Sequence, residues 1–186
     1  HLRRVGASTQ DGVDGSCVRR ALAQLCRGLQ ALHGAGKVHR DIKPENVLVT
    51  SAERVVILDF GLVANVSSEQ TSDLGAVGTY VYMAPEQGAG QAVTEKADWY
   101  SVGVLLYEVL SGRTPFAGPG LKVLMRKQTE EPPPPRQFNS AIPDDLNALC
   151  VDLLRTDPEA RPSAREIFRR LNVDLDAEDA LFQATA

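Results

Sequence analysis

Residues 39–61 read HRDIKPENVLVTSAERVVILDFG, and this segment carries the clearest structural signal in the chain. Two short apolar runs, residues 47–49 and 55–58, consist of valine, isoleucine and leucine, and the polar residues 50–54 lie between them. β-Branched residues favour strands, and two such runs around a polar turn are typical of an antiparallel hairpin. We therefore predict a β-hairpin over residues 47–58.

The predicted hairpin would bring three oxygen-bearing side chains to one of its ends. Asp41 and Asn46 precede the first strand, and Asp59 follows the second. In an antiparallel pair the start of one strand lies beside the end of the other. Carboxylate and amide oxygens are hard ligands that suit Mg²⁺. The sequence therefore predicts that these three oxygens converge on a site suited to a magnesium ion.

Four short motifs follow one another along the chain: HRDIKPEN at residues 39–46, DFG at 59–61, GT at 78–79 and APE at 84–86. In this order and spacing they resemble the motifs of a protein kinase. The first matches the catalytic-loop signature H-R-D-L-x-x-x-N except that Ile42 replaces leucine. Lys43 resembles the serine/threonine-specific branch of the family. The sequence DWYS at residues 98–101 resembles the corresponding sequence of bacterial kinases of eukaryotic type.

The resemblance implies a phosphoryl-transfer site that uses ATP and Mg²⁺. In the kinase scheme Asp41 accepts the proton of the substrate hydroxyl, and Lys43 steadies the transferring group. Asn46 and Asp59 would hold Mg²⁺ on the ATP phosphates. The resemblance sets the nucleotide against Lys43, Glu45, Asn46, Leu48 and Asp59, with Leu48 beneath the adenine ring. The implied function is a serine/threonine protein kinase that transfers the γ-phosphate of ATP to hydroxyls of protein substrates.

Further positions are implied for substrate placement and for control by phosphorylation. Thr79 resembles the residue that contacts the catalytic aspartate and lysine and favours serine and threonine substrates. Arg40 lies beside the catalytic aspartate, and an arginine can bind a phosphate through two parallel hydrogen bonds. We expect residues 62–83 to form a long connection that carries the activating phosphorylation site, with Thr71 or Ser72 as the acceptor.

Five residues are expected to support this site without taking part in the chemistry. The resemblance puts His39 in the core near the Phe60 ring, although histidine is often a general base. Asp98 is expected to hold the backbone of the catalytic loop. Glu86 and Arg161 are expected to form a buried ion pair that fastens the activation segment to the last helix.

The rest of the chain predicts a mainly helical protein. Apolar residues recur at intervals of three and four, as in helices that bury one face. Helices are expected at residues 17–33, 94–111, 121–128, 144–155 and 163–171, the last with a capping box formed by Ser163 and Glu166. The helix over 94–111 is apolar on nearly all sides, so we expect it at the centre of the core. The proline run 130–135 is expected to be extended.

The fold class is therefore α+β, mainly α with one small β-hairpin. The resemblance implies a protein-kinase-like fold limited to the large C-terminal lobe. We expect a leading loop at residues 1–16, the kinase C-lobe at 17–171, and an acidic tail or linker at 172–186.

Upstream of His39 the sequence has no G-x-G-x-x-G loop, no V-A-I-K strand and no partner glutamate helix. We therefore expect the small N-terminal lobe to be absent, and the missing lobe of the same polypeptide to be a partner. The isolated chain would then be inactive, because half of the nucleotide cleft is lost. Since the chain begins with His1 and not with methionine, we expect it to be a piece of a longer protein.

Two other functions stay open. A kinase-like scaffold or pseudokinase would use the lobe as a binding surface without catalysis. A small-molecule phosphotransferase of kinase-like fold would share the aspartate and asparagine of the catalytic loop. The APE motif at residues 84–86 and its partner Arg161 argue against this second alternative.

Composition narrows the remaining possibilities. A chain of 186 residues can bury one sizeable core, and a net charge of −4 without a basic run argues against nucleic acid as a partner. The three cysteines form no C-x-x-C or Cys/His pair, which favours a reducing, cytoplasmic location and argues against a metal site built on cysteine. The longest apolar run, residues 102–106, is far shorter than the roughly 20 residues that span a membrane.

Overall fold

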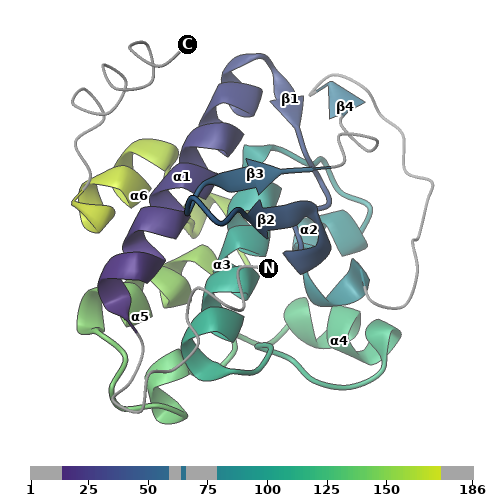
Figure 1. Cartoon of the computed structure of the whole chain (residues 1–186). Coiled ribbons are helices and arrows are strands. Elements are labelled where there is room, and N and C mark those ends of the chain that lie inside the picture. The colour runs from purple at the N-terminus through teal and green to yellow at the C-terminus, as the bar shows by residue number, and fades with distance from the viewer. Residues whose placement is uncertain (1–13, 59–63, 66–78, 173–186) are drawn as a thin grey trace.

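The computed structural model describes residues 14–58, 64–65 and 79–172. Within these ranges the protein consists mainly of α-helices, with two small sheets of two strands each (Figure 1). The prediction of a mainly helical fold with little β-structure is confirmed. The predicted leading loop lies outside the described residues up to position 13, and Gly15 and Ser16 belong to the first helix. Residues 173–186 of the expected tail also lie outside them.

The helix at the centre of the protein is α3 (Glu95–Ser111), which confirms the helix predicted over 94–111. Thr94 caps its start by accepting a hydrogen bond from the Lys96 N–H at 3.3 Å. Gly112 ends it with a φ of +72°, a left-handed conformation that favours glycine. Twelve of its 17 residues are buried, so it has almost no face left for solvent.

The long helix α1 (Gly15–Gly34) packs beside α3 (Figure 1). It begins two residues before the predicted start at residue 17. The reason is Asp14, whose carboxylate accepts hydrogen bonds from the Ser16 and Cys17 N–H groups at 3.0 and 3.1 Å. An aspartate that satisfies the free donors of the first turn stabilises a helix start. The buried face of α1 consists of Val18, Ala21, Leu22, Ala23, Leu25, Cys26 and Leu29.

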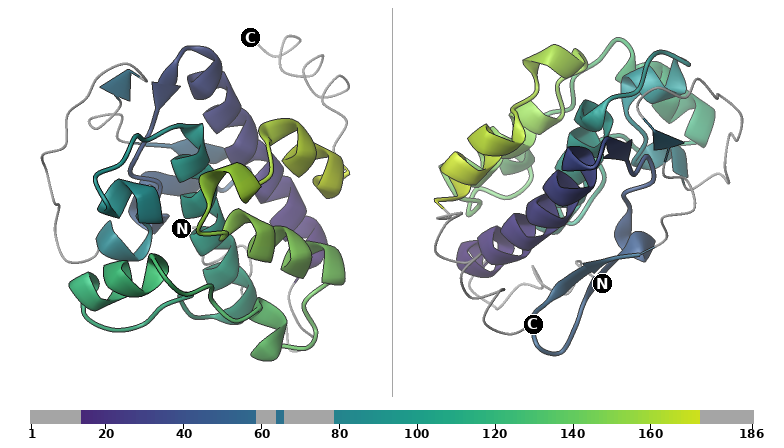
Figure 2. Two further views of the ribbon diagram at one scale, coloured as in Figure 1. Left: turned by 180° about the vertical axis from the view of Figure 1, so that it is seen from behind. Right: turned by 90° about the horizontal axis from the view of Figure 1, so that it is seen from above.

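The predicted hairpin is confirmed. Strand β2 (Val47–Val49) pairs antiparallel with β3 (Val55–Ile57), and the pair extends away from the helices on one side (Figure 2). Gln24 of α1 holds the hairpin by accepting a hydrogen bond from the first N–H of β3 at 2.9 Å. A Cβ at Gly28 would lie 2.8 Å from the end of the Ile57 side chain, so the missing side chain lets the strand approach the helix closely.

A second sheet was not predicted. Strand β1 (Lys37–Val38) pairs antiparallel with β4 (Ala64–Asn65). The connection over residues 62–83 was expected to be a loop, and this is wrong at two places. Ala64–Asn65 is a strand, and Thr79–Val81 forms a 3-10 turn. Most of the remaining connection lies outside the described residues.

The other elements follow in chain order: the 3-10 turn Pro44–Asn46, α2 (Pro85–Gly88), α4 (Gly120–Lys127), the 3-10 turn Pro135–Gln137, α5 (Asp144–Leu153), the 3-10 turn Pro158–Ala160 and α6 (Ala164–Leu171). Helix α5 ends two residues earlier than predicted. Pro135 opens a 3-10 turn and so does not belong to the extended run. The Ser163 hydroxyl accepts the predicted hydrogen bond from the Glu166 N–H at 3.3 Å. The Glu166 carboxylate instead pairs with Arg169 and Arg170.

Across the described parts of the chain, no helix combines the length and the apolar character that crossing a bilayer needs.

Candidate active site

The backbone of residues 39–40 is fixed by Asp98 in the first turn of α3. The Asp98 carboxylate is fully buried and accepts hydrogen bonds from the His39 N–H at 2.9 Å and the Arg40 N–H at 2.8 Å. The His33 ring nitrogen Nε2 lies 2.8 Å from the same carboxylate, and the Gln87 amide donates to the Arg40 carbonyl at 2.8 Å. These bonds hold Arg40 at a φ of +67°. Such strained backbone persists where its surroundings fix it, and it is common at functional sites.

His39 is buried in the core and has both ring nitrogens engaged. Nδ1 accepts a hydrogen bond from the Asp41 N–H at 3.4 Å, and Nε2 lies 3.2 Å from the Leu58 carbonyl oxygen. An accepting Nδ1 requires the proton to be on Nε2, which can then donate to Leu58. The side chain has no exposed surface, and this disfavours a role as a general base. Its expected neighbour Phe60 lies outside the described residues.

The Asp41 carboxylate is held between a cation and an amide. Lys43 Nζ lies 2.6 Å from Oδ2, and Asn46 Nδ2 donates to the same oxygen at 3.0 Å and to the Asp41 carbonyl at 2.9 Å. The carboxylate is 8% exposed. Within the described part of the chain, Oδ1 accepts no hydrogen bond. The geometry therefore leaves one carboxylate oxygen able to accept a proton from a bound hydroxyl.

The chemistry of Asn46 fits one half of the predicted magnesium site. Its amide nitrogen donates both of its hydrogen bonds to Asp41, so the amide oxygen is the atom left to act as a metal ligand. Asp59, the other predicted ligand, lies outside the described residues. The Leu58 N–H donates to the Asn46 carbonyl at 2.8 Å, so the residue that precedes Asp59 lies directly beside Asn46. Amide and carboxylate oxygens are the donor set that Mg²⁺ prefers.

The hairpin turns two different faces to its surroundings. Val47 is fully buried, and Val49, Val55 and Ile57 pack against the core. The opposite face carries Leu48, which is half-buried, together with Val56 and Leu58, which are 38% and 37% exposed. The apolar strip of Leu48, Val56 and Leu58 begins next to Asn46, whose carbonyl accepts the Leu58 N–H. Glu45 is exposed next to it.

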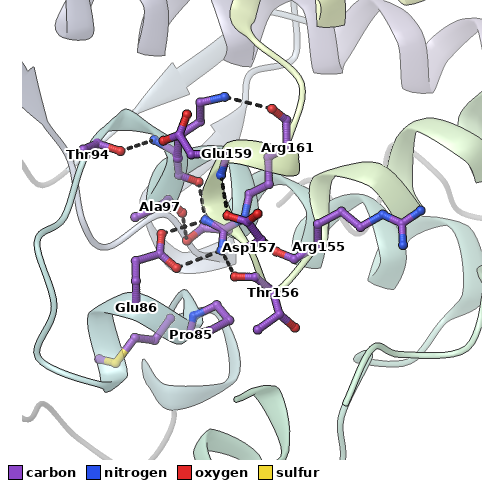
Figure 3. A network of polar contacts seen from close by, with 12 residues as sticks. Pro85, Glu86, Thr94, Ala97, Arg155, Thr156, Asp157, Glu159 and Arg161 are labelled. Carbon is purple, nitrogen blue, oxygen red and sulfur yellow. Dashed lines mark hydrogen bonds and ion pairs between the residues drawn. The ribbon is translucent and has the colours of Figure 1, made fainter. Parts of the chain in front are cut away.

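Glu86 of α2 and Arg161 form a buried ion pair (Figure 3). Both oxygens of Glu86 accept hydrogen bonds from Arg161, at 2.6 and 2.8 Å. The other donors of Arg161 reach the carbonyl oxygens of Arg155, Lys96 and Thr156 at 2.8, 2.9 and 3.0 Å. All five N–H donors of the guanidinium are therefore used. Arg161 precedes α6, so the pair ties α2 to the loop before the last helix and not to the helix itself.

Residues expected to control the site are only partly described. The Arg40 Nε is buried and has no hydrogen-bond partner among the described residues. Thr79 begins the 3-10 turn Thr79–Val81. Thr71 and Ser72 lie outside the described residues.

Lys127, the last residue of α4, was not among the site residues predicted from the sequence. Its side chain is 1% exposed, and its ammonium lies within 2.9 Å of the carbonyl oxygens of Tyr80, Val81 and Met83. Burial lowers the pKa of Lys127 to about 7, while the three carbonyl dipoles favour the charged form. The signal in the sequence was its spacing, because Lys127 follows the buried Val123 by four positions, on the same face of the helix.

The chain is similar in sequence to known protein kinases. The family model described as "Protein kinase domain" matches residues 4–171. The chain is 41% identical over 145 residues to serine/threonine-protein kinase PknA of Mycobacterium tuberculosis, covering 77% of this chain and 32% of that protein. It is 40% identical over 155 residues to serine/threonine-protein kinase Pkn1 of Myxococcus xanthus, covering 80% of this chain and 22% of that protein.

A solved structure of the twitchin kinase region from C. elegans matches with a TM-score of 0.79 and 29% sequence identity. The match covers 91% of this chain and 30% of that one. The chain thus spans about a third or less of the length of these relatives. On the extent of the family match and the identity to serine/threonine kinases, the chain belongs to the protein kinase family.

Proposed function

We propose that this chain provides the catalytic lobe of a serine/threonine protein kinase, with Asp41 as the catalytic base. The observation that carries the proposal is the setting of the Asp41 carboxylate. Lys43 and Asn46 fix one of its oxygens, and Asp98 fixes the backbone just before it. A base must be held in place and must keep an acceptor free toward the hydroxyl that it deprotonates.

The proposed reaction uses ATP and Mg²⁺. Asn46 and Asp59 would hold the ion on the ATP phosphates, and Lys43 would move from its partner Asp41 toward the transferring group. The apolar strip of the hairpin, with Leu48 at its centre, offers a surface for the adenine ring. Glu45 would contact the nucleotide from the same end of the hairpin.

The protein substrate would approach from the other side of Asp41. Thr79 is proposed to orient the acceptor hydroxyl. Arg40 has a buried Nε without a hydrogen-bond partner among the described residues, and a phosphate on Thr71 or Ser72 would supply the missing acceptor. Arg40 would in this way bind the phosphate directly beside the catalytic base, Asp41.

A small lobe would complete the nucleotide cleft, since the glycine-rich loop and the strand lysine do not occur in these 186 residues. The same observation favours one alternative, a kinase-like scaffold or pseudokinase that binds without catalysis. The two differ in a single measurable property, which is phosphoryl transfer by a protein that carries both lobes.

The test joins this chain to a kinase small lobe and measures transfer from ATP to a serine- or threonine-containing peptide. Asp41→Asn is expected to lower kcat by about 10²–10⁴-fold and to leave ATP affinity unchanged, because the base is lost and the nucleotide contacts remain. Asp144→Asn makes the same chemical change on a carboxylate that is 88% exposed, and it is expected to keep the parental rate.

Undiminished transfer by Asp41→Asn would contradict its role as the base. ATP binding without any transfer by the parent protein would favour the scaffold.

A further inference from the structure

The segment Tyr80–Met83 follows Thr79 directly, and one ammonium group holds most of its backbone. Lys127 Nζ donates to the carbonyl oxygens of Tyr80 at 2.9 Å, Val81 at 2.5 Å and Met83 at 2.8 Å. Below its pKa of about 7 the Lys127 ammonium has three N–H donors, one for each of these acceptors, and the neutral amine at higher pH keeps two of them. Lys127 therefore fixes three carbonyl groups within four consecutive residues.

The carbonyl group that Lys127 leaves out is also held by a side chain. Ser101 of α3 donates from its hydroxyl to the Tyr82 carbonyl at 2.8 Å. Gln128, the residue after α4, donates to the Pro85 carbonyl at 2.6 Å. Beyond the turn Thr79–Val81 the segment has no helix or strand of its own. Its backbone conformation therefore depends on the donors that α3 and α4 supply.

Close packing brings α4 against the segment at its first turn and against α2 in its middle. A Cβ at Gly120 would lie 2.5 Å from the ring of Tyr80, so a side chain there would displace the ring. A Cβ at Gly88 of α2 would lie 2.0 Å from Leu124 of α4. Helix α4 thus contacts the segment through Gly120 and Lys127, its first and last residues, and contacts α2 through Leu124.

The charge of Lys127 is balanced by dipoles and not by a carboxylate. Within residues 14–58, 64–65 and 79–172, no acidic side chain forms an ion pair with it. Its ammonium lies 5.2 Å from the centre of the Tyr100 ring. The Arg161 guanidinium lies 4.9 Å from the centre of that ring, and it is in turn paired with Glu86. A lysine buried without a carboxylate partner needs hydrogen bonds to offset its lost hydration, and here the three carbonyl oxygens supply them.

We propose that Lys127 is a positioning residue for substrate binding, because it fixes the segment Tyr80–Met83 and through it the adjoining Thr79. The proposal rests on the proposed function, in which Thr79 orients the acceptor hydroxyl. Lys127 touches neither substrate nor nucleotide in this scheme. Its contribution is to hold the segment Tyr80–Met83, which follows Thr79 directly, so that substrate binding does not have to order the segment first.

The first test measures backbone hydrogen exchange in this chain, and it does not depend on activity. Lys127→Met keeps an unbranched side chain but removes all three donors, so amides of residues 80–91 are expected to exchange about ten- to a hundredfold faster. Lys122→Met is the matched control, since Lys122 is exposed on the same helix, and it is expected to change nothing. Lys127→Gln, whose amide keeps two N–H donors, is expected to give an intermediate increase.

Unchanged exchange over residues 80–91 in Lys127→Met would overturn the proposal. An equal acceleration in α1 and α5 would also overturn it, because the effect would then be loss of overall stability. Lys127→Gln keeps the comparison possible if the methionine variant does not fold.

The second test measures kinetics in the protein that joins this chain to a small lobe. Lys127→Met is expected to raise KM for the peptide about tenfold and to leave KM for ATP within about twofold. Loss of folded protein would lower kcat and leave both KM values unchanged. Faster exchange with an unchanged peptide KM would therefore reduce Lys127 to a structural residue. A parent protein that transfers no phosphate would refute the proposed function, while the exchange result would still report on the segment.

Discussion

Arg161→Met is expected to destabilise the protein strongly, because it leaves a buried charge without a partner. Glu86 is 4% exposed and accepts both of its side-chain hydrogen bonds from Arg161. Removing one partner from a buried pair typically costs about 3–5 kcal/mol. For a domain of this size, 1 kcal/mol corresponds to about 2–4 °C in Tm. The expected decrease in Tm is therefore about 6–20 °C.

Glu86→Gln should lower the stability less than Arg161→Met does, and the hydrogen bonds of Arg161 give the reason. Glu86→Gln leaves the Arg161 guanidinium with three acceptors, the carbonyl oxygens of Arg155, Lys96 and Thr156. Arg161→Met leaves the Glu86 carboxylate with none of its present side-chain partners. The double variant should then be no less stable than Arg161→Met alone, because no unpaired carboxylate remains.

Urea unfolding followed by circular dichroism measures all three variants on the same scale. Arg169→Met is the matched control, since Arg169 pairs with Glu166 at 2.7 Å but is 72% exposed. Exposed pairs contribute at most about 1 kcal/mol. The reasoning would be refuted if Arg161→Met and Arg169→Met lowered the free energy of unfolding equally, or if Glu86→Gln were the more damaging single change.

Two further predictions concern packing and protonation. Gly103→Ala is expected to lower the free energy of unfolding by about 1–3 kcal/mol, because the added Cβ would lie 2.8 Å from the Cβ of Leu153 across the contact between α3 and α5. Urea unfolding measures this change. Gly34→Ala is the control, since a Cβ added at Gly34 would have no neighbouring atom within 4 Å. Burial lowers the pKa of Lys127 from 10.5 to about 7, so between these values the unfolded chain binds more protons and stability rises with pH by up to about 1.4 kcal/mol per unit. The added stability is lost as the pH falls to 7. When unfolding is measured from pH 7 to 9.5, the free energy of unfolding of Lys127→Met should lack this rise with pH. The neighbouring Tyr100, Arg161 and Glu86 are common to both proteins, so equal pH slopes would contradict the lowered pKa.

The sequence predicted those parts of the fold that have a local cause. The hairpin followed from two β-branched runs around a polar turn, and α3 followed from apolar residues on nearly all sides of one helix. The start of α1 at Gly15 was missed because its cap is a single aspartate within a polar region. Strands β1 and β4 have two residues each, which is too short for any alternating pattern to appear.

The candidate site was predicted as a set of residues, but its supports were only partly predicted. Motif spacing indicated Asp41 and Asn46, and the resemblance to protein kinases indicated Asp98. Neither the contact of His33 with Asp98 nor the three bonds of Lys127 could be predicted in the same way. Both join side chains to groups distant in the sequence, and a lysine on a helix is normally read as a solvated charge.

The hydrogen bonds of Asp98 have a consequence for how the protein is made. Arg40 and Asp98 are 58 positions apart, so a ribosome completes residues 39–46 well before it adds the carboxylate that shapes their backbone. Glu86 likewise waits for Arg161, which is added 75 residues later. A nascent chain that stops before α3 would carry every letter of the HRD motif and still lack its working geometry. Premature release during translation should therefore yield products in which the backbone of residues 39–40 is not fixed.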